Sequence, residues 1–117
     1  MKKIYHLSTC DTCQRIIKEL QLPEGFELQD IKMEAITVKQ LEEMRALAGS
    51  YEALFSKRAR LYREKGLNEK KLSETDFKNL ILEHYTFLKR PVIFVDDTVF
   101  VGNSKKVVEA AKEAIHS

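Results

Sequence analysis

Hydrophobic positions along the chain change their spacing at Cys10. Residues 4–7 form a short, mostly apolar run that predicts a strand. Beyond Cys10, apolar side chains recur at the i, i+3, i+4, i+7 spacing of one helix face; they are Cys13, Ile16, Ile17 and Leu20. Residues 26–31 alternate in polarity and predict a second strand. A strand, a helix and a strand within about 30 residues indicate a right-handed, parallel β-α-β unit.

The C-terminal part of the chain predicts two further strands and a helix. Residues 92–95 are continuously apolar, which is typical of a strand buried on both faces. A turn at 96–97 leads into a returning strand at 98–101. Ser104 is a suitable N-cap for a last helix, whose inner face is expected to carry Val107, Val108, Ala111 and Ile115. This part is therefore a predicted β-β-α unit.

The middle of the chain is predicted to be helical. Residues 37–40 fit a capping box, and the apolar residues that follow have helical spacing; they are Leu41, Met44, Leu47 and Ala48. Residues 73–76 begin another predicted helix, with an inward face made by Phe77, Leu80, Ile81 and Leu88. Between them, residues 51–65 are predicted to be helical up to a break at Gly66.

Composition and charge exclude several classes of protein. The chain has 117 residues, of which 44% are hydrophobic, so one core can form without disulfides or metals. Its 20 Lys and Arg residues nearly balance 18 Asp and Glu residues, which gives no argument for direct binding to nucleic acid or membrane. No run approaches the roughly 18 apolar residues that a membrane helix needs. We therefore expect a cytoplasmic, monomeric protein.

A basic cluster lies between residues 57 and 65. If this segment were one helix, its basic side chains would point in all directions around the axis; they are Lys57, Arg58, Arg60, Arg63 and Lys65. Such a distribution favours a solvated surface over a face that reads DNA. A surface for an anion or a partner remains the alternative.

The two cysteines, Cys10 and Cys13, are the main candidates for chemistry. In a cytosolic chain the C-x-x-C spacing indicates either a redox dithiol or half of a zinc site. Zinc usually takes four ligands, but a second C-x-x-C is absent and the three histidines, His6, His84 and His116, lack finger spacing. Two inert, buried cysteines are a further alternative. We favour the redox pair, with no metal and no cofactor.

The position of Cys10 indicates which thiol reacts first. Cys10 lies between a predicted strand and a predicted helix, where unpaired N–H groups and the helix dipole stabilise a thiolate. Such a position can lower a cysteine pKa from about 8.5 to about 3.5–7.5. Cys13 lies one turn further and faces the core. We predict that Cys10 is the nucleophile and Cys13 the resolving thiol.

Motifs along nearly the whole chain resemble the arsenate reductase (ArsC)/Spx family. They are Tyr5-His6-x-x-x-Cys10, Leu54-Phe55-Ser56-Lys57-Arg58, Tyr62, Gly66-Leu67 and Leu88-Lys89-Arg90-Pro91-Val92-Ile93. The resemblance implies an α/β, thioredoxin-like fold (β-α-β … β-β-α) with an inserted helical subdomain. We divide the single domain, 1–117, into a thioredoxin-like part of about 1–32 and 89–117 and a helical insert of about 33–88.

The family resemblance also implies roles around the thiol. It makes Cys10 the nucleophile and places Arg90 directly before a cis proline, Pro91. His6 matches a histidine that lies behind the catalytic thiol in the reductase branch. A strand histidine whose hydrogen bonds are satisfied by the backbone is the alternative interpretation of His6.

Three arginines hold the oxyanion in the reductase branch, and Arg90 matches one of them. Ser56 and Gly102 occupy the other two positions. Lys57, beside Ser56, could supply a charge for anion binding but not the bidentate fork of an arginine. The resemblance therefore predicts weak reduction of arsenate.

Two functions follow from the redox interpretation taken together with the family resemblance, which implies the partner named in the second. The first is a reductase of an oxyanion or a disulfide, with thioredoxin, glutaredoxin or glutathione as the electron donor. The second is an Spx-like regulator in which a Cys10–Cys13 disulfide controls binding to the α subunit of RNA polymerase.

Overall fold

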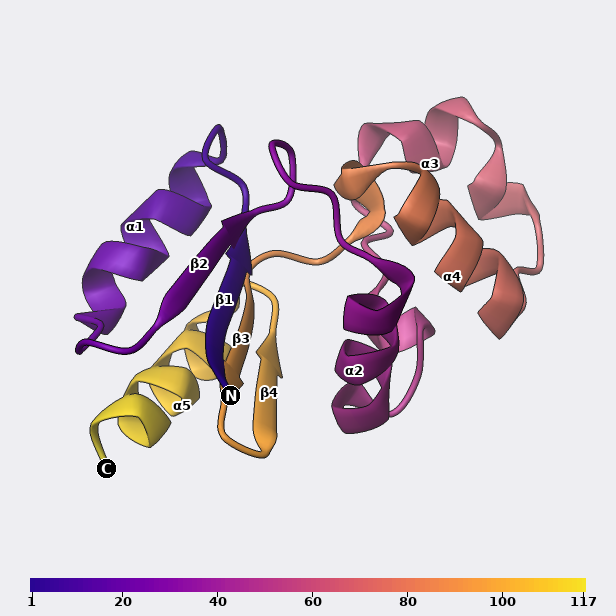
Figure 1. The fold of residues 1–117 in the computed structure, drawn as a ribbon. Helices are drawn as coiled ribbons and strands as arrows, with labels where there is room; N and C mark the ends of the chain where they lie inside the picture. The colour runs from indigo at the N-terminus through magenta and orange to yellow at the C-terminus, as the bar shows by residue number, and fades with distance from the viewer. The chain divides into compact units, whose positions relative to one another are not determined.

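Two units make up residues 1–117, all of which the computed structural model describes (Figure 1). The first, which we call the sheet unit, contains Met1–Ala35 and Arg90–Ser117. The second, the helical unit, contains Ile36–Lys89. No helix in either unit has the length and apolar character needed to cross a membrane.

The sheet unit contains a four-stranded mixed sheet with the strand order β2-β1-β3-β4. Its strands are β1 (Lys2–His6), β2 (Glu27–Asp30), β3 (Val92–Val95) and β4 (Thr98–Val101). β1 and β2 are parallel, whereas β1–β3 and β3–β4 are antiparallel. The β-α-β and β-β-α units predicted from the sequence are thus both present, and they share one sheet through the β1–β3 pairing.

Two helices, α1 (Asp11–Leu20) and α5 (Lys105–His116), belong to this unit (Figure 1). Both pack against one face of the sheet through a single apolar core, which contains Ile4, Ile16, Leu20, Ile93, Val95, Val108 and Ala111. Burial of each Val, Leu or Ile side chain of this kind contributes about 1.5–3 kcal/mol to folding. The helix faces predicted from apolar spacing are therefore confirmed, and the side chain of Ser104 caps α5 as predicted, by accepting a hydrogen bond from Val107 N.

The helical unit contains three α-helices, α2 (Val38–Ala48), α3 (Arg60–Glu64) and α4 (Glu74–Glu83). The predicted starts of α2 and α4 are confirmed, because Thr37 with Gln40, and Ser73 with Asp76, form complete capping boxes. Three short 3₁₀ helices complete the unit: η1 (Glu52–Leu54), η2 (Leu67–Glu69) and η3 (Tyr85–Phe87).

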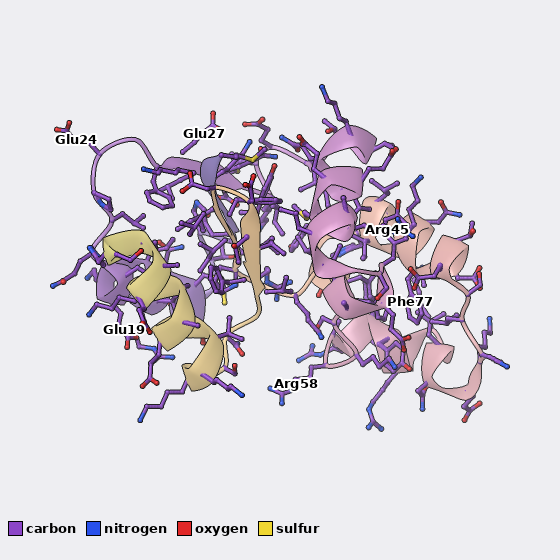
Figure 2. All side chains as sticks on the ribbon, turned by 90° about the horizontal axis from the view of Figure 1, so that it is seen from below. Glu19, Glu24, Glu27, Arg45, Arg58 and Phe77 are labelled. Carbon is purple, nitrogen blue, oxygen red and sulfur yellow. The ribbon has the colours of Figure 1, made fainter.

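The prediction that residues 51–65 are helical is confirmed only at η1 and α3. Helical structure stops after η1, and Phe55 adopts an extended conformation that pairs with Leu88 in an isolated β-bridge. The ring of Phe55 stacks on Phe87 at 5.2 Å and lies 4.9 Å from the Phe77 ring, labelled in Figure 2. Burial of Phe55 in this aromatic cluster outweighs local helix propensity.

Three smaller expectations for the helical unit also change. Leu88 is buried in the bridge with Phe55 and not on the face of α4, which ends at Glu83. Lys57 and Arg58 precede α3, so the basic cluster does not surround a single helix. Leu47 has helical spacing but is 45% exposed.

Candidate active site

A tight turn between β1 and α1 positions Cys10. The backbone N–H of Cys10 donates to the carbonyl of Leu7 at 3.0 Å, which closes the turn after the last strand residue, His6. Cys10 is the N-cap of α1, with φ −98° and ψ 109°. Its place at the start of the helix, predicted from the change in apolar spacing, is confirmed.

The environment of Cys10 favours its thiolate. Burial raises the pKa of the Cys10 thiol, but several groups together lower it more, so that the net pKa lies below its ordinary value. These groups are the backbone N–H and the thiol of Cys13, the positive charge of Arg90 and the backbone N–H of Thr12. The N–H groups belong to the first turn of α1, where backbone donors have no partner within the helix.

Cys13 lies in the opposite environment. Its side chain is 0% exposed, and the pKa of its thiol is raised to about 11, with burial as the largest cause. A hydrogen bond with the backbone of Leu7 lowers this pKa, whereas the negative charge of Cys10 and the hydrogen bond to Cys10 raise it further. Both cysteines are free thiols in direct hydrogen-bond contact, and only Cys10 reaches the surface.

Arg90 lies near both thiols in the structure, although it is distant from them in the sequence. It lies two residues before the start of β3, and the Arg90–Pro91 peptide bond is cis, as the family resemblance implies. The Nε atom of Arg90 is buried, and the positive charge of Arg90 lowers the pKa of both cysteines. The structure thus brings together Cys10, Cys13 and Arg90, which are separated in the sequence by the whole helical unit.

His6 lies at the end of β1, directly before the turn, and is 9% exposed. Its Nδ1 is 3.3 Å from Nε2 of Gln14, which also donates to the Leu7 carbonyl at 3.1 Å. The His6 ring therefore has a side chain of α1 as a partner, and backbone groups alone do not account for its hydrogen bonding. On the other side of the turn, Asp30 accepts hydrogen bonds from Ser8. These bonds are the main reason why the pKa of the Asp30 carboxyl lies below its ordinary value.

Sequence reasoning missed Gln14 and Asp30. Gln14 occupies a half-buried helix position next to the apolar face, and Asp30 ends β2 at the position paired with His6. Polar residues at such positions usually face solvent. The available signal was the spacing of Gln14, one helical turn after Cys10.

Lys57 belongs to the helical unit, where its Nζ forms an ion pair with Glu52 at 3.0 Å. The hydrogen bond to Glu52 is the main cause that raises the pKa of Lys57. Its predicted role in anion binding stays a prediction. Gly102, at a position where the family resemblance implies an arginine in the reductases, has φ +97° after β4, a conformation that favours glycine.

The other histidines have local partners. His84 Nδ1 accepts from the backbone N–H of Thr86 at 3.1 Å, and His116 Nε2 lies 2.7 Å from the Leu20 carbonyl. No three His, Cys, Asp or Glu side chains are grouped as ligands for a metal ion.

Comparison with known proteins finds a family whose model covers most of this chain. The model of the ArsC family matches residues 5–111. A protein of Haemophilus influenzae, described only as an uncharacterized protein, is 26% identical over 113 residues, which cover 95% of this chain and 98% of that protein.

Two solved structures illustrate the likeness of the fold. The arsenate reductase from Vibrio cholerae is 18% identical, with a TM-score of 0.76 over 97% of this chain and 96% of that chain. An arsenate reductase (ArsC) related protein from Brucella melitensis is 21% identical, with a TM-score of 0.71 over 93% of this chain and 92% of that chain. The predicted α/β, thioredoxin-like fold is therefore confirmed.

Proposed function

Because this chain belongs to the ArsC family, we propose that it is a thiol–disulfide oxidoreductase with Cys10 as the nucleophile and Cys13 as the resolving thiol. One observation carries the proposal: two thiols in hydrogen-bond contact have pKa values displaced in opposite directions. The accessible thiol is the one that ionises more easily. This asymmetry is what a nucleophile and a resolving thiol require.

The reaction begins when the Cys10 thiolate attacks one sulfur of a substrate disulfide. A mixed disulfide forms between Cys10 and half of the substrate, and the other half leaves as a thiolate that takes up a proton. Cys13 then loses its proton and attacks the Cys10 sulfur. The mixed disulfide breaks, a Cys10–Cys13 disulfide forms, and the second half of the substrate leaves as a thiolate. Two electrons pass to the substrate, and a dithiol such as reduced thioredoxin or glutaredoxin, or two glutathione molecules, restores the thiols.

The structure suggests why these steps occur in this order. The pKa of Cys13, about 11, is set first by burial, but the negative charge of Cys10 also raises it. That charge disappears when Cys10 enters the mixed disulfide, so Cys13 then loses its proton more easily. Burial of Cys13 meanwhile keeps external thiols away from it. Arg90 stabilises negative charge on either sulfur.

The site suits a disulfide better than arsenate. Of the three arginines that hold an oxyanion in the reductase branch, only the match at Arg90 is present, and Gly102 has no side chain to offer. Each charge-assisted hydrogen bond that is absent costs about 1.5–3 kcal/mol of anion stabilisation. An uncharged disulfide does not need this stabilisation.

Disulfide turnover tests the proposal. The purified protein is incubated with bis(2-hydroxyethyl) disulfide and either a thioredoxin or a glutaredoxin–glutathione reducing system, and arsenate replaces the disulfide in a parallel assay. We expect disulfide reduction that Cys10→Ser abolishes, and much slower arsenate reduction. Cys13→Ser should accumulate the mixed disulfide on Cys10, detected by mass spectrometry. Free Cys10 and Cys13 thiols that persist in an oxidising glutathione buffer would contradict the proposal.

A second candidate is a redox-switched regulator that binds a protein partner. It is favoured by exposed arginines on the helical unit, Arg58, Arg60 and Arg63, of which Arg58 extends away from the ribbon in Figure 2. They offer positive charge to an acidic surface such as one on the RNA polymerase α subunit. In pull-down with that subunit, we expect binding that depends on oxidation and is lost in Cys10→Ser. Equal binding by oxidised and reduced protein would exclude this candidate.

A further inference from the structure

The side chain of Gln14 connects the elements on both sides of the Cys10 turn. Its Nε2 lies 3.1 Å from the Leu7 carbonyl and 3.3 Å from His6 Nδ1. The same Leu7 carbonyl accepts the backbone N–H of Cys10, and the Cys10 carbonyl accepts the backbone N–H of Gln14 at 3.2 Å. One amide therefore links the end of β1, the turn and the second turn of α1.

The chemistry of the amide suits both of its acceptors. A primary amide has two N–H donors, so one serves the Leu7 carbonyl and the other serves His6 Nδ1. From the opposite side, Asp30 at the end of β2 accepts hydrogen bonds from Ser8, so the turn is held between α1 and β2.

We propose that Gln14 is a positioning residue for Cys10: by fixing the turn, its amide keeps the Cys10 thiol at the start of α1, close to the first backbone N–H groups of the helix. The proposal rests on the proposed redox function. Those N–H groups, from Thr12 and Cys13, stabilise the thiolate only while Cys10 keeps its N-cap conformation. The Leu7 carbonyl accepts hydrogen bonds from the Cys10 N–H and from the Gln14 amide. Without the amide only the Cys10 N–H remains, and the turn is attached less firmly to α1.

Gln14→Met tests this role because methionine has a similar length and helix propensity but no N–H donor. The pH dependence of Cys10 alkylation is measured in a Cys13→Ser background, so the result does not depend on disulfide formation. We expect the acid dissociation constant of the Cys10 thiol to fall about threefold. With Cys13 present, the reduction potential should become more negative by up to about 14 mV, which is a threefold change at 29.6 mV per tenfold for two electrons.

Glu19→Met is the matched control, because Glu19 is exposed on the same helix (labelled in Figure 2). It should leave the alkylation profile and the potential unchanged. An unchanged profile in Gln14→Met, even with a lower melting temperature, would overturn the proposal and make Gln14 a structural residue only. Gln14→Ala gives the same measurement if the methionine variant does not fold. Absence of a Cys10–Cys13 disulfide in the unmodified protein would refute the proposed function, while the profile in the Cys13→Ser background would still test Gln14.

Discussion

The sheet unit and the helical unit hold their elements together in different ways. In the sheet unit, segments from the two ends of the chain pair as neighbouring strands, and two helices share one apolar core with them. In the helical unit, local side chains close the ends of short helices, and a group of rings around Phe55 forms the centre.

This difference matters for the chemistry. The β1–β3 pairing places Arg90, which precedes β3, in the same unit as the cysteines that follow β1. All groups that displace the pKa of Cys10 belong to this unit. The cations of the helical unit include Lys57 and Lys65, which form ion pairs with carboxylates of the same unit. Strand pairing between the two ends of the chain assembles the reactive site, whereas ion pairs within the helical unit shape its charged surface.

The largest expected effect is on the stability of the helical unit. Phe55→Ala removes the ring that contacts both Phe77 and Phe87, and a buried Phe→Ala change costs about 3–5 kcal/mol. Denaturant unfolding should show this loss, while the alkylation profile of Cys10 in the folded protein stays the same. A shifted Cys10 profile would show that the thiol depends on the helical unit, and would break the comparison.

An intermediate effect is expected at the thiol itself. Arg90→Met removes a positive charge that lowers the pKa of Cys10, so this pKa should rise and the alkylation profile should move to higher pH. Alkylation near neutral pH should become several-fold slower. Lys65→Met, which removes a cation from the helical unit, is the control and should leave the profile unchanged. Equal shifts in both variants would show that the two cations act on the thiol alike.

The smallest effects are expected at the helix caps, one in each unit. Thr37→Ala removes the acceptor for the Gln40 N–H at the start of α2, and Ser104→Ala removes the acceptor for the Val107 N–H at the start of α5. Each change should cost about 1 kcal/mol in urea unfolding. A cost well above this value at one cap would show that its role extends beyond closing its own helix.

The sequence predicted best those elements whose side chains repeat with one regular period. The faces of α1 and α5, the fully buried β3 and the capping boxes of α2 and α4 all follow from residues close together in the chain. The same spacing predicts Cys10 at the start of α1 and Cys13 within it, because the start of a helix depends on local backbone donors and neighbouring residues.

Only the tertiary structure decided the features that depend on contacts between residues far apart in the sequence. Phe55 leaves the helical conformation because Leu88 offers a backbone bridge and Phe77 and Phe87 offer ring contacts. Gln14 becomes part of the site because the end of β1 presents acceptors at the right distance. Period and composition describe one segment at a time, whereas these hydrogen bonds and ring contacts exist only after separate segments have packed together.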